Sequence, residues 1–161
     1  MRVSVVIPNW NGEQLLPVCL SALRRQKSPP DQIILVDNHS SDRSIAVARG
    51  CCPGIVILEL GRNFGFGYAV NRGIEATDCD LVLLLNNDTE AMPDWVEVLS
   101  DFFRQNSQVL FCACKMLNYF DRSMLDGAGD CLTRAGVPYK IGSAEPDGAA
   151  YSAARKVFGA C

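Results

Sequence analysis

The sequence predicts an α/β fold with a mainly parallel sheet and helices on both of its faces. Short apolar runs, rich in β-branched residues, alternate four times with segments whose apolar residues recur at helical spacing, as βαβ units require. Each run stops abruptly in polar residues, as a strand does where it delivers a loop to the edge of a sheet. We expect strands at residues 3–7, 33–36, 55–58, 81–85 and 109–114.

The first two helices expected between these strands show start and stop signals. In the first, leucines recur at helical spacing up to Leu23, and Arg24 and Arg25 follow, where cations suit a helix C-terminus. The second should start after Asp42 and be closed by Gly50.

Two further helices follow the third and fourth strands. One leaves the glycine-rich loop 61–67 and ends near Ile74. The other begins near Pro93, and its expected buried stripe consists of Trp95, Val98, Leu99 and Phe102. Beyond residue 120 the apolar signal fades, which predicts loops and short strands.

With 161 residues, the chain is long enough for a single domain with a full core. We expect one domain over residues 1–161, divided into a core at 1–118 and a second region at 119–161. Fifteen basic and eighteen acidic residues give a net charge of −3, so charge gives no reason to expect a nucleic-acid partner. No apolar run approaches the roughly 18 residues that span a bilayer.

The N-terminus and the cysteines both indicate a reduced, cytoplasmic protein. Residues 1–8 lack the long apolar region and small-residue cleavage site of a signal peptide. The eight cysteines include no Cys-x-x-Cys pair, and His39 is the only histidine, so the spacing of a zinc site is missing. A disulfide scaffold is not expected at this length without a secretion signal.

The most apolar run, Leu81–Leu85, ends in Asn86, Asn87 and Asp88. Such a run suits a strand buried on both faces of a parallel sheet, and the loop after it would line the ligand crevice. There Asp88 would be a hard oxygen ligand for Mg²⁺ or Mn²⁺ and, through the ion, for phosphate oxygens. The alternative is an Asn/Asp turn that leads into the next helix.

Right-handed crossovers place the strand-end loops of a parallel sheet at one edge. The loops that hold Asn9, Asp37, Asn63 and Asp88 should therefore converge, which predicts a ligand site. Several of these polar-loop residues also have structural alternatives when taken singly. These are a turn or helix cap for Asp37, core cover for Trp10, a role within its helix for Asn71 and a solvated charge for Arg62.

The positions of the glycines exclude several classes of ligand-binding site. A dinucleotide-binding fold would show Gly-x-Gly-x-x-Gly directly after the first strand, but Pro8 to Gly12 stands there. The chain also lacks the P-loop pattern Gly-x-x-x-x-Gly-Lys-Ser/Thr and the Gly-x-Ser-x-Gly elbow of hydrolases. A nucleotide held by side chains and a metal remains.

Four ordered motifs together resemble the family 2 glycosyltransferases, and most of all their bacterial rhamnosyltransferase-like members. The motifs are Val5–Asn11, Val36–Asp42, Asn63–Gly67 with Asn71–Gly73, and Leu84–Thr89, within about the first hundred residues. The resemblance implies a Rossmann-like GT-A fold. It also implies inverting transfer of a hexose-type sugar from a nucleotide-sugar such as dTDP-rhamnose or a UDP-sugar.

The resemblance assigns donor-site roles at the matching positions. Pro8, Asn9 and Trp10 match the loop over the base, Asp37 the contact to the nucleobase or ribose, and Asn63, Gly65 and Asn71 the segment along the diphosphate and sugar. Asp88 matches the last carboxylate of the Asp-x-Asp motif, which holds Mg²⁺ or Mn²⁺, with Asn87 beside it. The chain departs from the family at Asn86, where many relatives have aspartate, and this implies weaker or water-mediated metal binding.

The same resemblance implies the partners. They are a nucleotide-sugar donor and a glycan or polyprenyl-linked acceptor, with no nucleic acid. Peripheral association with the inner face of the membrane through that acceptor, and self-association of the chain, are further expectations. The expected process is polysaccharide biosynthesis for the cell envelope.

The catalytic base is left unassigned. In the family it lies in an acidic motif after a Gly-Ala segment, and Val157–Cys161 resembles the beginning of that segment. Asp121, Asp126 and Asp130 do not match the motif, so we expect the base beyond Cys161 and no sugar transfer by the 161-residue chain. Two other functions stay open: a sugar-phosphate nucleotidyltransferase, which would want a basic glycine-rich loop after the first strand, and a non-catalytic nucleotide-binding piece.

Overall fold

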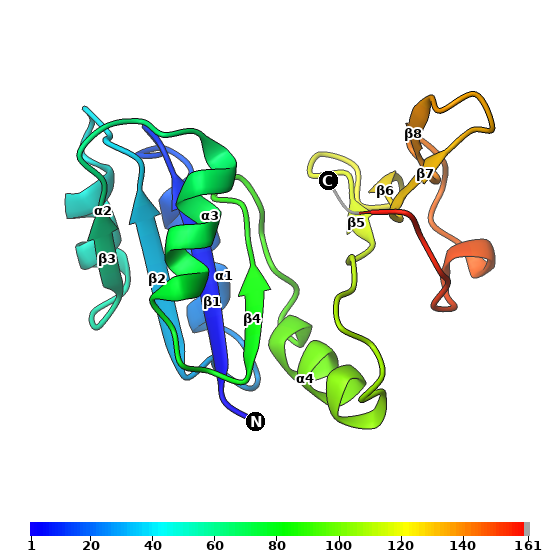
Figure 1. Ribbon diagram of the computed structural model, residues 1–161, viewed down its shortest axis with the longest axis horizontal. Helices are drawn as coiled ribbons and strands as arrows, with labels where there is room; N and C mark the ends of the chain where they lie inside the picture. Colours follow the sequence, from blue (N-terminus) through cyan, green and yellow to red (C-terminus); the bar gives the residue numbers. More distant parts are fainter. Residues whose placement is uncertain (160–161) are drawn as a thin grey trace. The chain divides into compact units, whose positions relative to one another are not determined.

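The computed structural model describes residues 1–159 and divides the chain into two compact units, Met1–Ser107 and Gln108–Cys161 (Figure 1). The first unit holds a four-stranded, fully parallel sheet in the order β3-β2-β1-β4. Its strands are β1 (Val3–Asn9), β2 (Gln32–Asp37), β3 (Val56–Glu59) and β4 (Leu81–Leu84). The predicted fold class is confirmed.

All four predicted helices are present, and they cover both faces of the sheet (Figure 1). They are α1 (Leu16–Arg24), α2 (Ser44–Cys51), α3 (Phe66–Glu75) and α4 (Trp95–Gln105). Pro17 lies in the first turn of α1, where its missing N–H leaves no helical hydrogen bond unmade. Helix α2 continues through Gly50, so the expectation that this glycine closes the helix is wrong.

The alternation of side chains along the strands decides which helix covers which face. Val5 and Ile7 of β1 are fully buried in a cluster with the leucines of α1 and residues of α2 and α4. Val6 points the other way, into a smaller cluster with Val36 of β2 and Ala69 of α3. Strand β1 is thus buried on both faces, which explains why most of its residues are apolar.

Helix α3 lies very close to the sheet because a glycine faces it. A Cβ atom on Gly73 would lie 2.3 Å from Cγ1 of Val6 and 2.9 Å from Cγ2 of Val36. Real Cβ atoms do not come this near to other heavy atoms, so any larger residue would push the helix away from β1 and β2.

The predicted fifth strand at 109–114 is wrong. None of these residues is in a strand, and the side chains of Leu110 and Phe111 are 90% and 74% exposed. An apolar run becomes a strand only where a neighbouring strand completes its backbone hydrogen bonds, and the sheet of the first unit ends at β4. The first unit accordingly ends at Ser107, before the predicted division at 118. The stripe expected on α4 also needs correction, since Val98 is exposed and Val96 is buried instead.

The second unit consists of loops and short strands, as predicted. Strand β5 (Met116–Leu117) pairs with β6 (Leu125–Gly127), and β7 (Asp130–Leu132) pairs with β8 (Pro138–Lys140). A short 3₁₀ helix, η1 (Ala149–Tyr151), follows. No helix within residues 1–159 has the length and apolar character needed to cross a membrane.

Candidate functional site

A pocket of about 410 Å³ lies at the carboxyl ends of the strands of the first unit. The strand order reverses at β1, since the chain runs outward through β2 and β3 and then returns to β4 on the other side. A crevice at such a switch point is the usual ligand site of an open α/β sheet, and its volume suits a small molecule. The lining residues are Pro8, Asn9, Trp10, Asn38, Asn63, Gly65, Phe66, Ala69, Asn86, Asn87 and Asp88.

The loops after all four strands do converge on this pocket. Seven of the nine predicted donor-site residues line it: Pro8, Asn9, Trp10, Asn63, Gly65, Asn87 and Asp88. The other two, Asp37 and Asn71, are not among the lining residues. Asn71 lies on an exposed part of α3, and its contact to a ligand stays a prediction.

Two aromatic side chains line the pocket and remain largely open to solvent. Trp10 is 58% exposed and Phe66 is 62% exposed. Trp10 therefore does not cover the core, and that structural alternative is wrong. Exposed aromatic faces beside a polar pocket can stack on the ring of a base or a sugar.

Asp37 is buried at the end of β2, with 2% of its surface exposed. Its Oδ1 accepts hydrogen bonds from Asn9 Nδ2 at 3.0 Å and from Ser40 Oγ at 2.6 Å. Its Oδ2 accepts from the Ser40 backbone N–H at 2.9 Å. The turn function weighed for Asp37 is thus confirmed, while its contact to a nucleobase or ribose stays a prediction.

The hydrogen bonds continue from Asn9 to the loop after β4. Asn9 is 2% exposed, and its Oδ1 accepts a hydrogen bond from Asn87 Nδ2 at 2.8 Å. Asp37, Asn9 and Asn87 therefore form a relay of side chains that joins three strand-end loops. Asn9 lies directly opposite Asp37 in the register of β1 and β2, so both side chains emerge on the same face.

Asn38 is a site residue that the sequence prediction missed. It lines the pocket and is 5% exposed. Its Nδ2 donates to Asn63 Oδ1 at 2.9 Å and to the carbonyl of Gly65 at 3.2 Å, and its Oδ1 accepts from the Phe64 N–H at 2.9 Å. Asn38 thus holds the loop before α3, where Gly65 has a φ of 87° that favours glycine.

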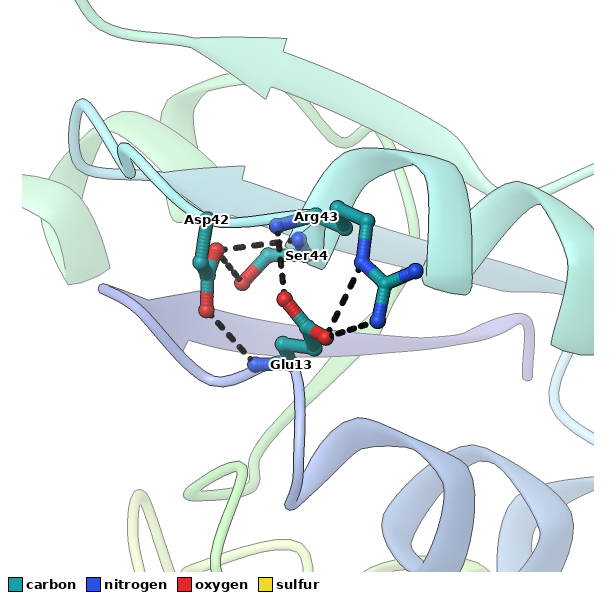
Figure 2. Close-up of polar contacts among 4 residues, drawn as sticks. All are labelled: Glu13, Asp42, Arg43 and Ser44. Atoms are coloured by element: carbon teal, nitrogen blue, oxygen red, sulfur yellow. Dashed lines mark hydrogen bonds and ion pairs between the residues drawn. The ribbon is translucent and has the colours of Figure 1, made fainter.

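A cluster of charged residues ties the loop after β1 to the start of α2 (Figure 2). Glu13 Oε1 accepts from Nε and Nη2 of Arg43 at 3.1 and 2.6 Å, and its Oε2 accepts from the Arg43 N–H. In return, Asp42 accepts from the Glu13 N–H and from the N–H and hydroxyl of Ser44. The cluster holds the loop that carries Trp10 without contacting the pocket.

These contacts lower the pKa values of both carboxyl groups. The hydrogen bond from the Arg43 side chain lowers the pKa of Glu13 from its ordinary value of 4.5. Burial raises the pKa of Asp42, but the hydrogen bonds from Ser44 and from the Glu13 N–H outweigh it, so the pKa falls below 3.8. A carboxyl group with a lowered pKa in the folded state stabilises the fold above its unfolded pKa and loses that contribution as pH falls through the folded pKa.

We therefore expect Glu13→Gln to lower the melting temperature at pH 7, and we expect the difference to shrink as pH falls through the lowered pKa of Glu13 and to vanish once that carboxyl group is protonated in the folded state. Thermal unfolding between pH 3 and 7 measures this difference. Glu97→Gln, which removes an exposed charge from α4, is the control. A wild-type advantage that grew toward low pH would contradict the assignment.

The loop after β4 is a turn that leaves Asp88 exposed. The Asn86 carbonyl accepts from the N–H and hydroxyl of Thr89 at 3.2 and 2.6 Å, so the Asn/Asp turn alternative holds, while Asp88 also lines the pocket as predicted. Beneath the turn, the thiol of Cys19 donates weakly to the same carbonyl at 3.8 Å. Burial, helped by the charge of Asp88, raises the pKa of Cys19 to about 12.

The donor atoms of the pocket suit a metal that is shared with a ligand. No group of three or more His, Cys, Asp and Glu side chains within residues 1–159 could enclose a metal ion. Asp88 offers one carboxylate, and Asn86 and Asn87 offer amide oxygens beside it. Mg²⁺ and Mn²⁺ are commonly held by one or two carboxylates together with the phosphates of a substrate, so the residues fit such an ion.

Comparison with known proteins agrees with this geometry. The glycosyl transferase family 2 pattern matches residues 4–128. A protein of Pectobacterium carotovorum subsp. carotovorum (strain PC1) named undecaprenyl-phosphate 4-deoxy-4-formamido-L-arabinose transferase is 35% identical over 116 residues, which are 68% of this chain and 36% of that protein. The protein of the same name from Serratia proteamaculans (strain 568) is 32% identical over 157 residues, 83% of this chain and 48% of that protein.

The solved structures that resemble this chain show the same fold. The crystal structure of S. aureus TarS 1-349 in complex with UDP-GlcNAc has a TM-score of 0.62 at 20% identity and covers 66% of this chain and 32% of that one. This confirms the predicted GT-A fold. This chain spans between about a third and a half of the relatives named above. The rhamnosyltransferase-like subgroup stays a prediction. The match over most of its length shows that this chain belongs to glycosyl transferase family 2.

Proposed function

We propose that this chain is the donor-binding part of a glycosyltransferase that holds a nucleoside diphosphate sugar, with Mg²⁺ or Mn²⁺ on the diphosphate, for inverting transfer to a glycan or a lipid-linked acceptor. The pocket at the strand ends supports this proposal most strongly. Asp88 is the one charged side chain among the described residues that line it.

The charge of the pocket argues for the metal. A diphosphate is an anion, and the lining residues include no lysine or arginine to balance it. Asp88 is exposed, and two like charges 4 Å apart repel by roughly 1 kcal/mol in water, so Asp88 alone disfavours the diphosphate. A divalent cation held by Asp88 reverses the sign of this interaction, and when bound it also neutralises the charge that develops on the leaving diphosphate.

The other lining residues divide between the two ends of the donor. Trp10 and Phe66 offer apolar faces for the base or the sugar. Each side chain has only two rotatable bonds, so ordering it on a ligand costs little side-chain entropy. Asn63 and Gly65 lie in the loop that Asn38 holds, where backbone and amide groups can bind sugar or phosphate oxygens. We propose no general base, since Asp126 forms an ion pair with Lys140 at 2.9 Å and Asp121 accepts hydrogen bonds from Ser123.

The names of similar proteins support the two substrates. Relatives are named undecaprenyl-phosphate transferases, which supports a polyprenyl-linked acceptor at a membrane surface and a role in the cell envelope. Structures of TarS in complex with UDP and with UDP-GlcNAc support a uridine nucleotide as donor. The aligned part makes up 36% and 48% of the two relatives, and we propose that the 161-residue chain binds the donor without transferring sugar above background.

The lack of a cationic lining residue speaks against the alternative of a sugar-phosphate nucleotidyltransferase. In nucleotidyl transfer, negative charge develops on the triphosphate in the transition state, and lysine or arginine side chains are needed at the phosphates to stabilise it. The loop after β1 brings only Trp10 to the pocket. A donor-binding piece without catalysis of its own remains compatible with every lining residue.

Isothermal titration of the 161-residue chain with UDP, dTDP and GDP tests the proposal. We expect saturable binding of one of these nucleotides in Mn²⁺ or Mg²⁺, and at least about a tenfold loss of affinity in EDTA. Adenosine diphosphate and inorganic diphosphate are controls for the base and for charge alone. Binding of all these ligands with equal affinity, or of none, would refute the donor site.

A further inference from the structure

We infer that Asn9 is a positioning residue that fixes the orientation of Asn87, so that Asn87 offers a carbonyl oxygen and not an N–H to a ligand beside Asp88. The orientation itself follows from the relay of Asp37, Asn9 and Asn87. Only the identity of the ligand rests on the proposed function.

The carboxylate of Asp37 sets the direction of the hydrogen bonds in the relay. An ionised carboxylate accepts hydrogen bonds and donates none, and Asp37 takes three from Asn9 and Ser40. Asn9 must therefore turn its Nδ2 toward Asp37. Its Oδ1 is then directed to Asn87, which has to supply its own Nδ2 at 2.8 Å. The charge at one strand end thus decides which atom an amide presents at another.

Gly12 encloses the link between the two asparagines. A Cβ atom on Gly12 would lie 2.2 Å from Asn9 Oδ1 and 2.4 Å from Asn87 Nδ2, so the backbone of this glycine lies against their hydrogen bond. Its N–H is bonded to Ser44 Oγ at 2.9 Å, which fixes it in place. The relay has little room in which to rearrange.

This arrangement defines what Asn87 can bind. No described residue donates a hydrogen bond to Asn87 Oδ1, and Asn87 lines the pocket next to Asp88. A carbonyl oxygen accepts from a hydroxyl or an N–H of a ligand, but it repels a phosphate oxygen. Asn87 therefore favours either a hydrogen-bond-donating part of the nucleotide-sugar or the metal ion beside Asp88, and it does not bind the phosphate oxygens directly.

A reversal of the relay tests the inference. Asn87→Asp places a carboxylate against Asn9 Oδ1, and Asn9 cannot turn round because its Oδ1 would then face Asp37. In the Asp37→Asn background the whole relay can reverse, since the new amide donates to Asn9 Oδ1 and Asn9 Nδ2 donates to the new carboxylate. Asn87→Asp should lower the melting temperature of the ligand-free chain by about 4–8 °C with Asp37 present and by less than about 2 °C with Asp37→Asn.

Asn86→Asp is the matched control. It adds the same charge one residue away, on an exposed side chain, and its effect should not depend on position 37. Equal destabilisation by Asn87→Asp in both backgrounds would overturn the inference, as would failure of Asn87→Asp to fold in both. Folding of the double variant alone would support it.

Nucleotide binding gives the second readout. With UDP and Mn²⁺ as the probe, Asn87→Asp should lose about tenfold in affinity, and the double variant should recover most of this loss relative to Asp37→Asn alone. Lost affinity without recovery in a double variant that is restored in stability would overturn the role of Asn87 in binding. The ligand-free coupling is independent of the proposed function, whose own failure would appear as no UDP binding by the wild type.

Discussion

Asp88→Ala should weaken the binding of UDP in Mn²⁺ about 100-fold, which corresponds to about 2.7 kcal/mol, and should slightly strengthen it in EDTA. The sign changes because Asp88 acts in two ways. With the cation it is the one charged metal ligand among the lining residues, and without the cation it repels the diphosphate. Isothermal titration of the variant and the wild type under both conditions measures the four affinities.

Asp101→Ala provides the control for charge. It removes an exposed carboxylate from α4, where Asp101 pairs with Arg104 outside the pocket, and it should leave both affinities unchanged. An Asp88→Ala variant that kept the wild-type response to Mn²⁺ would show that the metal binds elsewhere.

Gly73→Val should lower the free energy of unfolding by about 3 kcal/mol or more, the largest effect on stability that we expect from a single substitution. The added atoms would collide with Val6 and Val36, which are fully buried in the sheet and cannot move aside. Helix α3 would then have to separate from β1 and β2, and the pocket wall at Phe66 and Ala69 would move with it. Urea denaturation measures the change in free energy.

Gly67 offers a matched comparison in the same helix. Nothing lies within 4 Å of a Cβ atom built there, so Gly67→Ala should stabilise α3 by up to about 1 kcal/mol through its helix propensity. Gly73→Ala should destabilise it by about 1–3 kcal/mol. Equal effects of the two alanines would contradict the close packing of α3 at Gly73.

The parallel sheet could be predicted from the sequence because burial on both faces requires a recognisable local pattern of apolar residues. A strand such as β1 must be apolar at most positions, and the helices between strands must keep one apolar stripe. The segment 109–114 has the same local composition without the same environment. Its side chains at Leu110 and Phe111 are exposed, because pairing depends on a partner strand, and composition alone does not specify one.

The site could be predicted as a set of loops but not as a set of contacts. Topology brings the strand ends together, and so Asn63 and Asp88 line the pocket as expected. Asp37 and Asn38 illustrate contacts that could not be predicted from the sequence. The two are adjacent and similarly polar, yet alternation at the end of β2 gives them different surroundings: Asp37 bonds to Asn9 and Asn38 to the loop before α3. Register between β1 and β2, which sequence does not give directly, decides this division.

The modification rate of the Cys19 thiol can report on opening of the loop after β4, which carries Asp88. Cys19 is fully buried under the Asn86 carbonyl and is kept protonated by its raised pKa, so it is chemically silent while the turn is closed. Cys19 also packs in the core between α1 and the sheet, so a thiol reagent can reach it only in molecules in which the turn and this packing have opened. The time course of its modification would therefore record how often the loop that carries Asp88 leaves its place. A ligand that contacts Asp88 should slow the modification of Cys19, and the size of this decrease would measure the free energy with which the ligand stabilises the closed turn.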